Sequence, residues 1–208
     1  MNIEDQLVLF YELYGEPADN SKISAAEALR RINRSRRNLA IKLKFYDVKD
    51  SITATGGEGY FTMREDFLGL YERARDCAFY DSVPMKLKTL ANWGEITNSG
   101  IPIGLVQPRY GMMHGRTFYV YPPCEAGKVL MWWGYGVPPA LGAVSSGDAY
   151  LTDSQAELTV MDAAIKARGE TGEAIPQTMV EDYRELRAEI RRKAQSQGPR
   201  LEPAPEYE

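Results

Sequence analysis

Apolar residues recur at helical spacing in two segments near each end of the chain. The first segment, 3–14, repeats them at steps of four, three and four residues: Ile3, Leu7, Phe10 and Tyr14. These steps return to one side of a helix, so the segment predicts an amphipathic helix. Asn2 can cap its start, and Gly15 fits its end.

A second helix is predicted over 24–46. Its buried face is marked by Ala28, Ile32, Ser35, Leu39 and Leu43. Ser24 and Glu27 have the spacing of a capping box, in which each side chain binds the other residue's backbone amide. The remaining sides are basic and carry Arg30, Arg31, Arg34, Arg36, Arg37, Lys42 and Lys44.

Two further helices are predicted near the C-terminus, over 153–168 and 176–196. Thr152 and Gln155 form a second possible capping box, and Gly169 is the expected end of the first of these helices. The apolar positions of the two helices are Leu158, Met161 and Ile165, then Met179, Tyr183, Leu186 and Ile190. Four helices with one apolar face each are expected to form a bundle.

Between the helix pairs, the pattern changes to the alternation typical of strands. "SITATGGEGYFTM" (51–63) alternates around two glycines and predicts a hairpin, and "LANWGEI" predicts a short helical turn. The other strand candidates are "FLGLYERA", "VPMKLKTL", "IPIGLVQ", "RTFYVY" and "KVLMWWGY". The expected class is α+β: a bundle of N- and C-terminal helices with a central antiparallel β insertion. The expected parts are a helical lobe (1–47 and 148–196), a β-rich lobe (48–147) and a C-terminal arm (197–208).

Composition narrows the classes of function. The chain has 208 residues and a formal net charge of −4, which argues against whole-surface binding of nucleic acid. Its two cysteines, Cys77 and Cys124, are expected to stay reduced. No apolar run is long enough to span a membrane, and the N-terminus lacks the basic region of a secretory signal.

The sequence offers few candidates for catalytic or ligand-binding residues. His114 is the only histidine and is expected at the surface of a turn, so we assign it no catalytic role. "TATGGEGY" and "EAGKVL" lack the sequence context of a phosphate-binding loop. Glu65 and Asp66 are adjacent, so a strand would point them apart. We therefore expect no catalytic residue, no cofactor and no metal.

Helix 24–46 carries the strongest local charge. Its arginines surround the helix, so they are not all expected to lie on one contact face. We predict that Arg30, Arg34 or Arg37 contacts an acidic residue of a neighbouring chain or faces DNA. Trp132 and Trp133 should point to opposite faces of their strand, so that one fills the core and the other needs a cover, such as segment 137–150, or lies at an interface.

The order of these signals resembles the head-to-tail adaptor (connector) proteins of tailed bacteriophages. After the paired helices come "YFTMREDFLGL", "NWGEITNSGIP", "FYVYPPC" and "KVLMWWGYGVPPAL", and "TDSQAELTVMDAAIKA" closes the module. Tyr60, Asp66 and Phe67 match one family phrase, although Arg64 replaces a proline there. "YGEPAD" is similar to tubular adaptors of short-tailed phages. The resemblance covers most of residues 1–196.

The resemblance implies a non-enzymatic structural protein of the virion neck, made in the host cytoplasm. It implies a homo-oligomeric ring, usually of twelve copies, that docks under the portal protein and joins the capsid vertex to tail or nozzle proteins. The ring would extend the channel for genomic DNA without reading its sequence, and no membrane is involved. Two alternatives stay open: a DNA-binding module that uses helix 24–46, and an unrecognised hydrolase.

The C-terminal segment "QGPRLEPAPEYE" has three prolines and few apolar residues, so it is not expected to fold alone. We expect an arm that reaches a neighbouring subunit or the portal. Its predicted contact residues are Arg200, Leu201, Glu202 and Tyr207. Deleting 197–208 should then weaken docking to the portal and leave the thermal stability of the monomer nearly unchanged.

Overall fold

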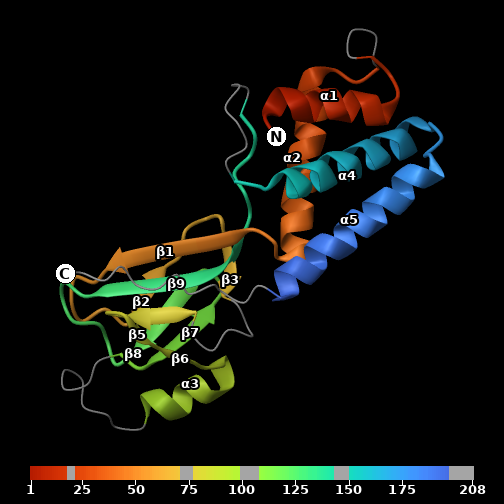
Figure 1. The fold of residues 1–208 in the computed structure, drawn as a ribbon. Helices are drawn as coiled ribbons and strands as arrows, with labels where there is room; N and C mark the ends of the chain where they lie inside the picture. Colours follow the sequence, from red (N-terminus) through yellow and green to blue (C-terminus); the bar gives the residue numbers. More distant parts are fainter. Residues whose placement is uncertain (18–21, 71–76, 99–107, 143–149, 197–208) are drawn as a thin grey trace, which may run out of the picture. The chain divides into compact units, whose positions relative to one another are not determined.

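The computed structural model describes residues 1–17, 22–70, 77–98, 108–142 and 150–196 (Figure 1). The chain divides into two compact units. Unit 1 consists of Met1–Tyr46 and Val137–Ser196, and the described part of unit 2 lies within Asp47–Gly136. Helices at both ends of the chain flank central sheets, so the predicted α+β class is confirmed.

Unit 1 is built from four helices: α1 (Ile3–Tyr14), α2 (Ala25–Leu43), α4 (Asp153–Thr171) and α5 (Gln177–Ser196). Helix α4 contacts the other three and is the centre of the unit. It is buried on more than the one expected face, at Ala156, Leu158, Thr159, Val160, Met161, Asp162, Ala163, Ala164 and Ala167. Its many alanines leave room for three neighbours, which explains why it departs from the one-sided pattern.

The helix ends follow local signals in most cases. Asn2 with Asp5 and Thr152 with Gln155 form capping boxes, and Gly15 ends α1 with φ 84°. The predicted box at Ser24 is incomplete, because the Glu27 carboxylate binds Arg30 and Arg31 instead.

Two predicted helix ends are wrong by a few residues. Helix α2 stops at Leu43 rather than near Tyr46, because Lys44 adopts a left-handed conformation with φ 53°. Helix α4 continues through Gly169 to Thr171 and is capped by Gly172, whose φ is 76°. Glycine tolerates this conformation at a helix end, and a nearby glycine within the helix does not force a stop.

Unit 2 contains two sheets and the short helix α3 (Leu90–Thr97). The five-stranded sheet comprises β1 (Asp47–Thr53), β9 (Val129–Gly136), β4 (Ala78–Tyr80), β5 (Val83–Pro84) and β3 (Phe67–Leu70). The four-stranded sheet has the order β2 (Tyr60–Thr62), β8 (Thr117–Tyr121), β7 (Tyr110–His114), β6 (Lys86–Leu87). All described pairs are antiparallel except β6 with β7.

The predicted hairpin over 51–63 is wrong. Strand β1 pairs with β9 and strand β2 pairs with β8, so the two arms belong to different sheets. Gly56 and Gly57, with φ of 107° and 76°, turn the chain between the sheets. The Gly57 amide donates to the carbonyl of Cys124 at 2.7 Å, which ties this corner to the chain before β9.

Strand β9 separates the two tryptophans as expected. Trp132 is 1% exposed and lies near the ring of Phe118 from the other sheet. Trp133 is half-buried: the ring of Phe79 meets it edge-on, and the Lys49 ammonium lies 5.2 Å from its centroid. Neighbouring strands therefore contact Trp133, whereas the sequence had proposed segment 137–150 as its cover.

The ends of unit 2 meet, because Asp47 and Tyr135 are antiparallel partners in β1 and β9. After β9, the chain rejoins unit 1 along α2. The side-chain amide of Asn33 donates to the Leu141 carbonyl at 3.2 Å and accepts from the Leu141 amide at 2.7 Å. Unit 2 is thus inserted into unit 1 through two adjacent crossings.

Candidate interfaces on the helical unit

Three exposed arginines share one face of α2. Arg30, Arg34 and Arg37 follow at steps of four and three residues, which return to the same side of a helix. Ile41 continues this line and is 44% exposed. We call Arg30, Arg34, Arg37 and Ile41 the α2 stripe. The expectation that the arginines cannot all lie on one contact face is confirmed, because three of the five share this face and the other two do not.

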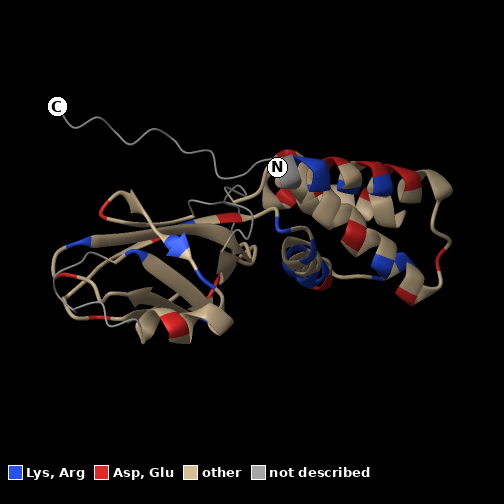
Figure 2. Cartoon of the chain, turned by 90° about the horizontal axis from the view of Figure 1, so that it is seen from below, with Lys and Arg blue, Asp and Glu red and all other residues tan. Residues whose placement is uncertain are grey.

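Those two arginines bind within unit 1. Arg36 is 1% exposed, and its guanidinium donates to the Pro139 carbonyl at 3.2 Å. Arg31 forms ion pairs with Glu27 and Glu170 at 2.9 and 2.5 Å. Figure 2, which looks nearly along α2, shows Lys and Arg on several of its sides. The helix therefore combines structural cations with an exposed cationic face.

The α2 stripe is neutralised at one end only. Arg30 is paired with Glu27, whereas Arg34 and Arg37 form no ion pair with any described residue. The pKa of Glu170 is lowered, chiefly by its hydrogen bond and charge interaction with Arg31 and to a smaller extent by the charge of Arg34. Arg37 and Ile41 thus form the end of the stripe that is open to a partner.

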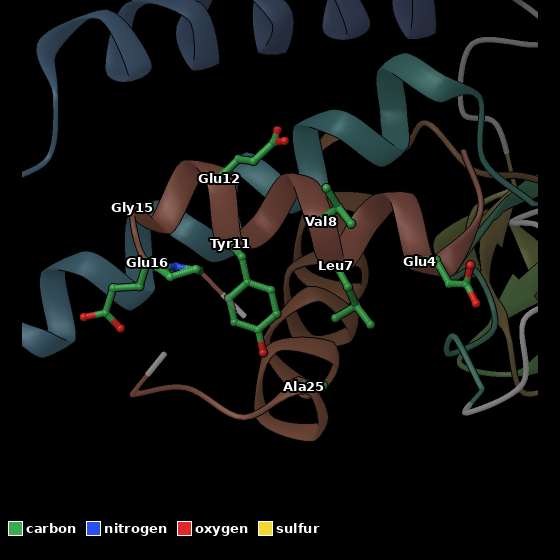
Figure 3. A pocket seen from close by; sticks show the side chains of 9 residues that line it. Glu4, Leu7, Val8, Tyr11, Glu12, Gly15, Glu16 and Ala25 are labelled. Atoms are coloured by element: carbon green, nitrogen blue, oxygen red, sulfur yellow. The ribbon is translucent and has the colours of Figure 1, made fainter. Parts of the chain in front are cut away.

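A groove of about 600 Å³ lies along the outer side of α1 (Figure 3). We call it the α1 groove; it is lined by Glu4, Leu7, Val8, Tyr11, Glu12, Gly15, Glu16, Pro17 and Ala25. Leu7 and Tyr11 point toward the start of α2 at Ala25, while Val8 and Glu12 lie on the adjacent side of α1. The groove therefore has an apolar floor and an acidic margin.

Two of the three acidic residues at the edge of the α1 groove, Glu4 and Glu12, are available to a binding partner. Glu16 already accepts from the Lys22 amide at 2.9 Å. Glu4 and Glu12 are exposed and form no hydrogen bond or ion pair with the part of the chain that the structure describes. Between them, Val8 is 57% exposed. The sequence carries one signal of this surface, which was not used above: Glu4, Val8 and Glu12 recur at steps of four on the solvent side of the predicted helix.

A second acidic groove lies between α4 and α5, with a volume of about 580 Å³. It is lined by Glu157, Met161, Asp182, Glu185, Leu186, Ala188, Glu189 and Arg192. Glu189 is paired with Lys193 at 2.5 Å, and Arg192 supplies a cation within the groove itself. This groove is more polar and partly neutralised by its own lining.

The other residues singled out from the sequence do not lie together in one site. His114 is exposed at the end of β7, and Glu65 is exposed in the turn before β3. Cys77 and Cys124 are buried free thiols, as expected; burial, assisted by the charge of Glu58, raises the pKa of Cys124 to about 12. Across the described ranges, no group of three or more His, Cys, Asp or Glu residues is arranged to hold a metal ion.

Two further expectations concern membranes and the arm. Within the described residues, no helix is long and apolar enough to cross a membrane. The predicted arm residues Arg200, Leu201, Glu202 and Tyr207 lie outside the described residues.

Comparison with known proteins identifies the family. No protein of curated function matches the chain. A family model described as SU10 adaptor protein matches residues 17–203, which include most of unit 1 and all of the described part of unit 2. The chain therefore belongs to the SU10 adaptor protein family, a family of bacteriophage adaptor proteins.

Proposed function

We propose that the protein is a non-enzymatic head-to-tail adaptor of the virion neck. Copies of the chain form a ring, of twelve subunits by the resemblance noted above, that docks under the portal protein and receives the tail or nozzle proteins. The ring extends the channel through which genomic DNA passes. The observation that carries this proposal is the family match across 17–203, which spans both units of the fold.

The fold is compatible with a repeated subunit. A ring needs a head-to-tail interface in which two different patches of the same protein meet. Unit 1 exposes two such patches of opposite charge, the α2 stripe and the α1 groove. Unit 2 adds an aromatic surface, where Tyr60 is 66% exposed and the rings of Tyr60 and Trp93 both lie beside Tyr119.

A null mutation of the gene in its phage tests this function. Because the proposed ring joins the head to the tail, the mutant is expected to fill heads with DNA and to leave them without tails. Supplying the chain from a plasmid should restore tailed, infectious particles. Tailed particles at the wild-type yield in the absence of the protein would contradict the proposal.

A second candidate function is binding of duplex DNA by the α2 stripe. The observation that favours it is the alignment of Arg30, Arg34 and Arg37 on one exposed face. Affinity that falls steeply with salt, and that is lost in Arg34→Glu/Arg37→Glu, would support this function. Salt-independent or undetectable binding would exclude it.

A further inference from the structure

We propose that the α1 groove of one copy binds the α2 stripe of the next copy. Glu4, Val8 and Glu12 would meet Arg34, Arg37 and Ile41 of a second copy of this chain. This inference rests on the proposed ring and names the interface that closes it. The two surfaces are on the same unit, and each is exposed.

The charges of the two surfaces are opposite in sign, and none of the four charged residues is in an ion pair with a described residue. Glu4 and Glu12 form no ion pair with described residues, and the same holds for Arg34 and Arg37. Both acids of the α1 groove are therefore available to a partner, as is Arg37, while the charge of Arg34 also acts on Glu170. Opposite charges of this kind set the partner and the orientation of an interface more than its affinity.

The spacing of the two surfaces allows one Arg–Glu pair to form beside the apolar contact. On α1, Val8 lies four residues from Glu4 and four from Glu12. On α2, Ile41 lies four residues from Arg37. When Val8 packs against Ile41, Arg37 lies opposite Glu12 in an antiparallel arrangement and opposite Glu4 in a parallel one. Both motifs extend over about 10–12 Å of helix, given a rise of about 1.5 Å per residue.

The apolar residues distinguish a protein partner from DNA. Val8 and Ile41 are 57% and 44% exposed, and mutual contact would remove both from water. The phosphate backbone of DNA offers no apolar surface against which Ile41 could pack. Glu27 and Glu170 also lie beside the N-terminal part of the stripe, where they would repel phosphate. These features favour a second copy over nucleic acid.

The α4–α5 groove is the competing acidic surface. Arg192 lies in its lining and Glu189 is paired with Lys193, so these cations neutralise part of the groove's negative charge. The α1 groove has no cation in its lining, and its floor is apolar. The α1 groove is therefore the better match for a stripe that ends in Ile41.

Charge reversal tests the interface. The variants are Glu4→Arg/Glu12→Arg, Arg34→Glu/Arg37→Glu, and the quadruple variant that combines them. All four side chains are exposed, and equal melting temperatures check that the variants fold. Mass photometry and sedimentation velocity at low salt measure self-association. Each double variant should weaken association at least about tenfold, and the quadruple variant should recover most of it, because every interface then regains opposite charges.

A matched control uses the competing groove. Glu157→Arg/Glu185→Arg alone should leave association unchanged, and its combination with Arg34→Glu/Arg37→Glu should not rescue it. Rescue by this control, no recovery in the quadruple variant, or a wild type that is monomeric at its highest soluble concentration would each overturn the interface. The null-mutant phenotype in infection is independent of these results, so the proposed function can hold when this interface fails.

Discussion

Two glycines of β9, Gly134 and Gly136, allow a neighbouring strand of the sheet to approach this strand closely. A Cβ at Gly134 would lie 2.1 Å from the Gly69 carbonyl oxygen, and one at Gly136 would lie 2.3 Å from that of Asp66. Strand β3 crosses here, and it pairs with the same edge of β9 as β4 does. The missing side chains let the β3 backbone approach closely, which the sequence alone does not reveal.

Gly134→Ala is therefore expected to destabilise the protein by about 3 kcal/mol, the upper end of the usual cost of overpacking, since the clash is with backbone. Gly169→Ala is the matched control: this residue is exposed within α4, and nothing lies within 4 Å of an added Cβ. Alanine favours a helix there, so the control should gain about 0.5–1 kcal/mol. Urea unfolding measures both changes, and a neutral Gly134→Ala would contradict the close approach.

Tyr183 of α5 gives unit 1 a dependence on alkaline pH. Its hydroxyl donates to Asp162 of α4 at 3.1 Å, and burial, followed by the charge of Asp162, raises its pKa from 10.0 to about 12. The folded protein then holds a proton that the unfolded chain loses, so stability is present below pH 10 and falls as the pH rises toward 12. The free energy of unfolding of Tyr183→Phe should fall less over this range. Parallel pH profiles for both proteins would refute the assignment.

At the scale of elements, the helices were predictable and the strand pairing was not. Apolar steps of three and four, with caps at Asn2 and Thr152, are local signals, and all four predicted helices of unit 1 are present. Strand β1 pairs with β9 far along the chain, so alternation could locate strands but not choose partners. The arginines of α2 were recognised as interface candidates, but separating exposed Arg37 from buried Arg36 required the positions of α4 and of residues 137–141.

Asn33 binds the chain that returns from unit 2. Its side chain forms two hydrogen bonds with the backbone of Leu141, so Asn33→Ala should cost about 1–3 kcal/mol, the penalty of leaving partly buried backbone groups unpaired. Asn33→Asp keeps the acceptor for the Leu141 amide and should lose less. The control is Asn38→Ala on the same helix, whose side chain forms no hydrogen bond with described residues and should change stability little. Equal losses at positions 33 and 38 would contradict the specific role of Asn33.

At the scale of the whole molecule, the chain consists of two units that are joined by two chain crossings. Asp47 and Tyr135 are strand partners, so the ends of unit 2 lie close together. Antiparallel partners are separated by only about 5 Å between Cα atoms, a gap that a short linker can bridge. Among the described residues, the two core clusters of unit 1 take their buried residues from both ends of the chain and none from unit 2.

Replacing residues 47–136 with a short Gly-Ser linker is therefore expected to leave a folded helical unit. Far-UV circular dichroism should show a helical spectrum and one cooperative melting transition. The full-length protein is the control, and its spectrum should contain an additional β contribution. A linker variant without a cooperative transition would show that unit 1 depends on unit 2 for its fold.

The most direct test of the central claim is cryo-electron microscopy of purified virions of the encoding phage, with mass spectrometry to establish that the chain is present. We expect a ring of copies between the portal and the tail, with density that fits the four helices of unit 1 and the two sheets of unit 2 in each subunit. Absence of the chain from virions, or a neck built entirely from other proteins, would contradict the central claim.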